Sequence, residues 1–161
     1  MDDLIDEIDR AVRAELWMLA LAGALALPDI CAAVQSPNGK TTGSKYKRWV
    51  MDYLLGAYPK LDPDELHQMR CSLLHQGTSS AIKYKRVCFV SPRSGLIIHN
   101  SVINDALILD MPMFCRDVIA AVERWRLSVQ HTEAYRKNIE HVMRWHRGGV
   151  GDYFLGGEVL T

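Results

Sequence analysis

The sequence predicts a mainly α-helical bundle that carries a small β-hairpin insertion at about residues 83–110. Apolar residues recur at helical spacing over residues 3–26. Residues 62–77 carry the signals for both ends of a helix. β-Branched and aromatic residues then predominate until a second helical region begins at Pro112. Together these observations favour helices that pack on one another around a short β segment.

Length and composition are those of a soluble globular protein. The chain has 161 residues, of which 48% are hydrophobic and 24% are charged, enough to build one core. We expect a single helical domain over residues 1–147. The segment 148–161 contains five glycines, which predict a loosely ordered C-terminal tail.

Charge is unevenly distributed although the formal net charge is zero. Residues 1–35 hold seven acidic and two basic residues, whereas residues 36–104 hold ten basic and four acidic residues. No acidic residue lies between Glu65 and Asp105. A basic middle section is compatible with an anionic ligand, and more weakly with a nucleic acid.

Cysteine usage and hydropathy favour a cytoplasmic protein that contacts no membrane. The four cysteines are widely spaced and form no C-x-x-C pair, so we expect reduced thiols. The most apolar run, residues 16–28, is about a dozen residues long, while a membrane span needs about 20. The first ten residues are acidic, unlike the basic start of a secretion signal.

The N-terminal region is expected to form one long helix over residues 3–26. Pro28 then opens a short second helix that ends near Val34, because proline is tolerated in a first turn. The composition of residues 35–44 predicts a loop, and residues 45–58 predict a third helix.

The β insertion is expected to be a hairpin. Residues 82–90 and 95–102 read as its two strands, joined by the turn residues 91–95. Residues 106–111 are a candidate third strand. Two helices are expected to follow, in a region that extends from residue 113 to residue 146.

The segment "LDPDELHQMRCSLLHQG" predicts a helix with defined ends. Asp62 suits the N-cap, Pro63 suits the first turn, and Glu65 lies three residues after the cap, as in a capping box. Gly77 is expected to close the helix in the left-handed conformation.

Arg70 falls within the apolar arc of this helix, beside Leu66 and Met69. An unpaired buried charge is very costly, so Arg70 requires an anionic partner or a path to water. His75 lies about 140° away around the helix and about 7.5 Å along its axis, so helix geometry alone does not bring the two side chains together. One interpretation pairs Arg70 with an Asp or Glu from residues 3–26 and leaves His75 solvated.

The stretch "MRCSLLHQG" resembles the R-x4-H signature of the HEPN superfamily, and it lies near the C-terminal end of a long helix, as it does in that family. The resemblance implies a HEPN-like helical bundle. Many HEPN proteins are metal-independent endoribonucleases of toxin–antitoxin and related defence systems. They act as homodimers whose motif helices face each other across a cleft, which implies a twofold partner for this chain.

The resemblance implies catalytic roles for Arg70 and His75. Histidine titrates near neutral pH and can serve as general acid or base, while arginine presents a planar, charged fork to phosphate oxygens. A cognate antitoxin is a further implied partner. HEPN nucleases commonly carry a polar residue after the arginine, whereas Cys71 stands here. The alternatives are a non-catalytic nucleotide-binding or protein-interaction module, and a purely structural protein.

The tetrapeptide KYKR occurs twice, before and after the motif helix. Basic residues interleaved with tyrosine suit neutralisation of an RNA backbone together with base stacking. The alternative is a solvated basic rim with two partly buried tyrosines. The candidate nucleic-acid-binding residues are Lys45, Lys47, Arg48, Lys83, Lys85 and Arg86.

No metal or other cofactor is expected. His67, Cys71 and His75 share one helix stripe and are suitable ligand types for zinc. Three such residues span about 12 Å along a straight helix, which is too far for one tetrahedral ion.

Overall fold

The computed structural model describes residues 1–161, and it is mainly α-helical, as the sequence predicts. Six α-helices account for most of the 54% of the chain that is helical. They are α1 (Asp2–Arg13), α2 (Trp17–Val34), α3 (Gly43–Tyr53), α4 (Pro63–Gln76), α5 (Met111–Val129) and α6 (Glu133–Ile139).

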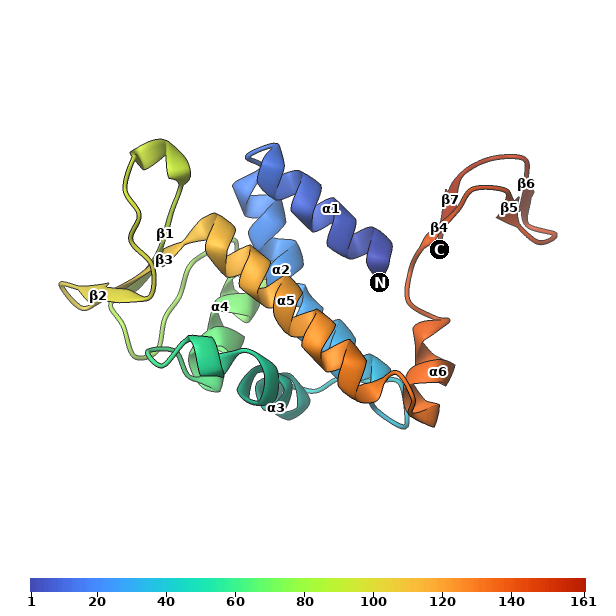
Figure 1. Cartoon of the computed structure of the whole chain (residues 1–161), viewed down its shortest axis with the longest axis horizontal. Helices are drawn as coiled ribbons and strands as arrows, with labels where there is room; N and C mark the ends of the chain where they lie inside the picture. The colour runs from blue at the N-terminus through green and yellow to red at the C-terminus, as the bar shows by residue number, and fades with distance from the viewer.

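Helix α2 is the centre of the fold. It contacts α1, α3, α4, α5 and α6, and Figure 1 shows α5 crossing the bundle beside it. The largest fully buried side chains, Trp49, Trp125, Tyr46, Tyr58 and Phe114, come from the helices and the turn around it. By length and composition α2 is the one helix that meets the requirements of a membrane span, but half of it is buried, which is consistent with the core helix of a soluble protein.

The predicted long N-terminal helix is wrong, because the chain turns back between α1 and α2. Glu15 adopts a positive φ of 58°, and α2 then continues through Pro28 to Val34 without a new start. The turn lets α1 bury Ile8 against α2, where Gly23 leaves room for it. A Cβ on Gly23 would lie 2.6 Å from Ile8 Cγ1.

The predicted hairpin is also wrong, although the strand at 106–111 is confirmed. Strand β1 (Arg86–Val90) pairs in parallel with β3 (Ala106–Asp110), and β2 (Ser101–Ile103) pairs with β3 in the antiparallel direction. The order is therefore β1-β3-β2. The tight turn is at Asn104 and Asp105, whose φ values of 50° and 63° fit the two-residue hairpin loop that joins β2 to β3.

The third helix is confirmed in part, since α3 ends at Tyr53 and is followed by a 3₁₀ turn, η1 (Leu55–Ala57). A second 3₁₀ turn, η2 (Pro92–Ser94), lies between β1 and β2.

The last predicted helix is shorter than expected, and the chain after it forms a β-structured arm. Helix α6 ends at Ile139. The C-terminal arm (residues 144–161) contains the pairs β4–β7 and β5–β6, both antiparallel. Their bounds are β4 (Trp145–His146), β5 (Gly149–Val150), β6 (Phe154–Leu155) and β7 (Val159–Leu160).

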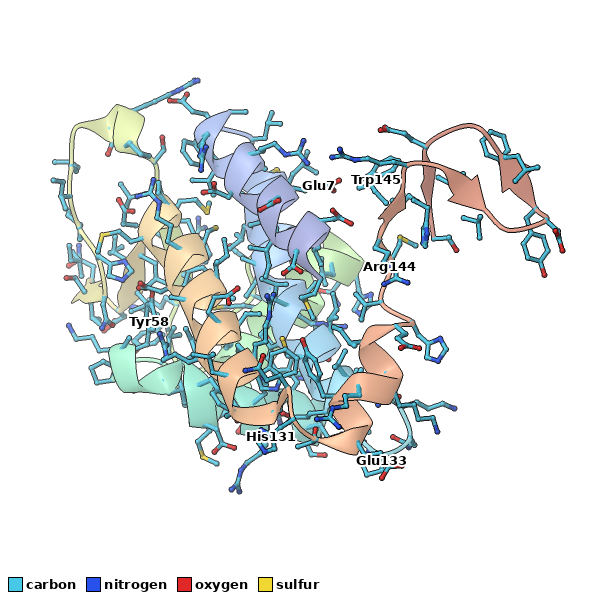
Figure 2. All side chains as sticks on the ribbon, turned by 45° about the vertical axis from the view of Figure 1, so that its right-hand side comes forward. Glu7, Tyr58, His131, Glu133, Arg144 and Trp145 are labelled. Carbon is cyan, nitrogen blue, oxygen red and sulfur yellow. The ribbon has the colours of Figure 1, made fainter.

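The C-terminal arm lies at the opposite end of the molecule from the three-stranded sheet (Figure 1). Trp145 joins it to α1: its backbone N–H donates to Asp3 Oδ2 and its indole N–H donates to Glu7 Oε1, each at 2.9 Å. Figure 2 shows Trp145 facing Glu7 across the gap between arm and helix.

Candidate functional site

Helix α4 has the ends that the sequence predicts. The Asp62 side chain accepts a hydrogen bond from the backbone N–H of Glu65 at 2.7 Å, and Pro63 occupies the first turn. Gly77 closes the helix with a φ of 65°, in the left-handed region where glycine is favoured. These local signals place Arg70 and His75 in the last two turns.

Glu65 does not complete the predicted capping box, because its side chain is fully buried. Its carboxylate instead accepts the backbone N–H groups of Ile82 and Lys83, at 3.1 and 2.8 Å. Ser72, also buried, accepts the N–H of Ser80 at 3.1 Å. The segment that leaves α4 is therefore held alongside the helix by buried polar side chains.

Arg70 has an anionic partner, as its place in the apolar arc requires. Its Nη2 lies 2.6 Å from Oδ2 of Asp29 in α2, and the hydroxyl of Thr41 donates to the other carboxylate oxygen at 3.1 Å. The partner comes from α2 rather than from residues 3–26. Partial burial by itself lowers the pKa of Arg70, but contacts with Cys71 and Asp29 more than offset this, so the pKa is raised.

Arg70 and His75 meet within one chain, so the expectation that helix geometry keeps them apart is wrong. Arg70 Nη1 lies 3.2 Å from His75 Nε2. The long arginine side chain spans the angular separation near the end of the helix. Because a guanidinium only donates hydrogen bonds, this contact requires a lone pair on His75 Nε2 and a proton on Nδ1.

The guanidinium of Arg70 therefore contacts the Asp29 carboxylate through Nη2 and the exposed His75 imidazole through Nη1. Its side chain is 23% exposed and that of Asp29 is 14% exposed, while His75 lies on the surface. The Nη1 side faces His75, which is exposed, so this side of the guanidinium is the one nearer to solvent. The Nε side is closed, since Nε is buried and has no hydrogen-bond partner.

Cys71 and His67 continue the polar cluster toward α3. Cys71 Sγ lies 3.8 Å from Arg70 Nη1 and 3.8 Å from His67 Nε2. The His67 ring packs edge-on against Tyr46, with ring centroids 5.3 Å apart. Burial lowers the pKa of His67, and the positive charges of Lys47 and Arg70 lower it further. His67 is therefore a neutral neighbour of the Arg70 site, a name that we use for Arg70, His75, Asp29 and Thr41.

Acidification is expected to destabilise the fold through His67. Its folded-state pKa lies below the ordinary value of 6.5, so the unfolded chain takes up the proton more readily as the pH falls through that value. The free energy of unfolding should fall with it. Urea unfolding at about pH 7.5 and about pH 5.5 measures this, and the decrease should be smaller in His67→Gln. The control His131→Gln, at an exposed residue, should match the wild-type decrease.

Removing Asp29 is expected to destabilise the protein by about 1–2 kcal/mol, because Arg70 is then left partly buried without a counter-ion. Urea unfolding of Asp29→Ala measures the loss. In an Arg70→Met background, the same substitution should cost much less. Equal losses in the two backgrounds would show that the ion pair contributes nothing to stability.

The two KYKR tetrapeptides precede and follow α4 in the chain. Three of their six basic side chains form ion pairs with carboxylates. Lys47 pairs with Asp64, Arg48 pairs with Asp52 at 2.9 Å, and Lys85 pairs with Asp105 at 2.8 Å. The remaining candidates, Lys45, Lys83 and Arg86, have no carboxylate within ion-pair distance, although Lys45 Nζ donates to Lys40 O and Asn38 Oδ1.

The two tyrosines of these tetrapeptides differ, because Tyr46 cannot stack on a base whereas Tyr84 is half-buried. Tyr46 is completely buried, and its pKa is raised by burial and by the nearby Asp29. The hydroxyl of Tyr84 donates to Lys60 O, and Lys83 Nζ lies 5.3 Å from the centre of its ring. A nucleic acid at this surface would therefore be held by charge rather than by stacking on Tyr46.

Asp29 and Thr41 are the site residues that the motif does not identify. Asp29 is the one acidic residue between Glu15 and Asp52, inside a strongly apolar stretch. Such an isolated carboxylate is a usable signal, because it needs a partner for the same reason that Arg70 does.

The chain was compared with family models, curated proteins and solved structures. No family model matches the chain, and neither a curated protein nor a solved structure matches it. The case for a function therefore rests on the residues and geometry of the Arg70 site.

Proposed function

We propose that the chain is a HEPN-like, metal-independent endoribonuclease whose site is built on Arg70 and His75. The observation that carries the proposal is the 3.2 Å contact between Arg70 Nη1 and His75 Nε2, with Asp29 holding the opposite side of the guanidinium. This places a permanent positive charge beside an exposed group that can transfer protons near neutral pH.

In the proposed reaction, the 2′-oxygen of RNA attacks the adjacent phosphorus and the 5′-oxygen leaves, which produces a 2′,3′-cyclic phosphate. A phosphate oxygen binds Arg70 Nη1 and displaces His75, whose Nε2 lone pair becomes free to accept the 2′-OH proton. Arg70 stabilises the charge that develops on the phosphorane. Asp29 orients the guanidinium throughout.

A homodimer is part of the proposal, for a chemical reason. The reaction also needs an acid for the leaving 5′-oxygen, and the Arg70 site of one chain offers one exposed imidazole. His67 is a poor second group, because burial and the nearby positive charges lower its pKa, and it lies about 12 Å along the helix from His75. A twofold partner would bring a second His75 to the same cleft.

The resemblance to HEPN nucleases suggests a toxin or defence role, with a cognate antitoxin as a partner. A cytoplasmic location is part of the same proposal, since all four cysteines are free thiols. Lys45, Lys83 and Arg86 are the free cations that would contact the RNA backbone.

The second candidate is a non-catalytic nucleotide-binding or protein-interaction module. The ion pair with Asp29 favours it, because that carboxylate already neutralises Arg70 and opposes a second anion. In this case phosphate would bind and no bond would break.

The two candidates are separated by incubating the protein with labelled RNA in EDTA. We expect cleavage of RNA to cyclic-phosphate ends, and no cleavage of the same sequence with 2′-O-methyl groups. Binding of both oligonucleotides without cleavage would establish the second candidate. Cleavage that stops in EDTA would rule out the metal-independent mechanism.

A further inference from the structure

A cavity of about 720 Å³ lies between α1, the end of α2, the loop after it, α6 and the C-terminal arm. Its volume is within the range of small-molecule sites. The floor is apolar and consists of Leu4, Ile30, Ala33 and Val34. Leu160 of the arm lies on the cavity wall.

We propose that this cavity binds a small amphipathic carboxylate with an acylated amino-acid pattern: an apolar chain, a hydrogen-bond donor and a carboxylate next to the donor. The apolar chain would lie on the α1–α2 floor. The donor would meet Asn138, and the carboxylate would meet Lys137.

Asn138 supplies an acceptor oxygen that no group of the protein uses. The residue is only 9% exposed, and its Nδ2 donates to Val34 O at 2.9 Å and Ser36 O at 2.7 Å. Its Oδ1 accepts no hydrogen bond and faces Gly39, where an added Cβ would lie 3.2 Å away. Asn138 and Gly39 both line the cavity. This oxygen is not among the buried polar atoms that lack a partner, so it is open to a donor from a ligand in the cavity.

Lys137 gives the cavity its preference for an anion. It lines the rim, is exposed, and has no carboxylate within ion-pair distance. The carboxylates on the opposite rim, Asp3 and Glu7, already accept the two N–H groups of Trp145. A ligand carboxylate therefore finds its counter-ion on the α6 side of the cavity, while its apolar chain lies on the floor.

N-decanoylglycine tests the proposal, because it carries all three features. Calorimetric titration of the full chain, below the probe's micelle concentration, should show saturable binding at one site. Decanoic acid, which lacks the amide N–H, should bind more weakly, and decylamine should bind more weakly still. Equal or tighter binding of decylamine would overturn the proposal, since it would show that the acidic rim selects the ligand.

Two neighbouring residues of α6 provide a matched pair of variants. Lys137→Glu should weaken binding of N-decanoylglycine by at least about tenfold, the loss of one charge-assisted contact. Arg136→Glu removes the same charge from an exposed residue that does not line the cavity, and it should leave the affinity unchanged. Equal effects of the two variants would overturn the proposal.

Filling the cavity is an independent check. Ala33→Phe places a ring on the floor and should abolish binding, provided that circular dichroism shows a folded protein. Binding that persists in a folded Ala33→Phe protein would place the ligand elsewhere. If this variant does not fold, the Lys137 and Arg136 pair still decides the outcome, because both residues are on the surface.

Discussion

Arg70→Ala is expected to lower the rate of RNA cleavage by about 10²- to 10³-fold in the EDTA assay. Removal of one preorganised donor from a developing oxyanion typically costs this much. Arg70→Lys should recover little of the loss, because an ammonium cannot bind Asp29 and a phosphate oxygen in one plane as the guanidinium does. The rates are measured under single-turnover conditions, so that they report on bond cleavage.

His75→Ala is expected to reduce the same rate by about 10²- to 10⁴-fold, the usual contribution of a general acid or base. His75 is exposed, so its removal should leave the unfolding midpoint nearly unchanged. The control is Gln76→Ala, an exposed neighbour in the last turn of α4, which should cleave at the wild-type rate. If His75→Ala also cleaves at that rate, His75 transfers no proton in the reaction.

Glu65→Ala is expected to produce the largest loss of stability, about 3 kcal/mol in the free energy of unfolding. The reason is that the fully buried carboxylate accepts the N–H groups of Ile82 and Lys83, which have no substitute partner once it is removed. Glu65→Gln retains one acceptor oxygen and should cost less than the alanine variant. Urea unfolding measures both.

The control for Glu65 is its neighbour in the sequence. Asp64 is exposed, and its ion pair with Lys47 is on the surface, so Asp64→Ala should change the free energy of unfolding by less than about 1 kcal/mol. Similar losses at the two residues would mean that the buried hydrogen bonds of Glu65 do not stabilise the segment after α4.

Local signals predict α4 well, and contacts between distant segments explain the failures elsewhere. Asp62 and Gly77 act within one turn of their own helix, so their roles can be read from neighbouring residues. The break between α1 and α2 carries no proline or glycine, and Glu15 adopts its positive φ because the two helices pack face to face. Nothing within residues 14–16 indicates that requirement.

In the sheet, too, local signals predict a strand and a turn, whereas contacts between distant segments decide the pairing. Strand composition correctly predicts β3, but closeness in the sequence predicts the wrong pairing, because the parallel neighbour of β3 is the more distant β1. A turn signal was present at Asn104 and Asp105, two residue types that tolerate positive φ. It indicates the hairpin between β2 and β3.

At the Arg70 site, the sequence identifies a cation that needs a partner but not which residue provides it. Asp29 lies on another helix, and the packing of α2 against α4 alone brings it to Arg70. Helix geometry fails to predict the contact between Arg70 and His75 for a different reason. Helix angles describe where a side chain leaves the backbone, whereas a long arginine side chain also reaches across the surface of the last turn.

The central claim is that the Nη1 side of Arg70 is a phosphate site with His75 beside it. The most direct measurement is a crystal structure of the protein with an RNA oligonucleotide that carries one 2′-deoxy residue at the scissile position. We predict a phosphate oxygen within hydrogen-bond distance of Arg70 Nη1, His75 turned toward the 2′ position, and Asp29 still paired with Arg70. An oligonucleotide bound elsewhere, with the contact between Arg70 and His75 intact, would contradict the claim.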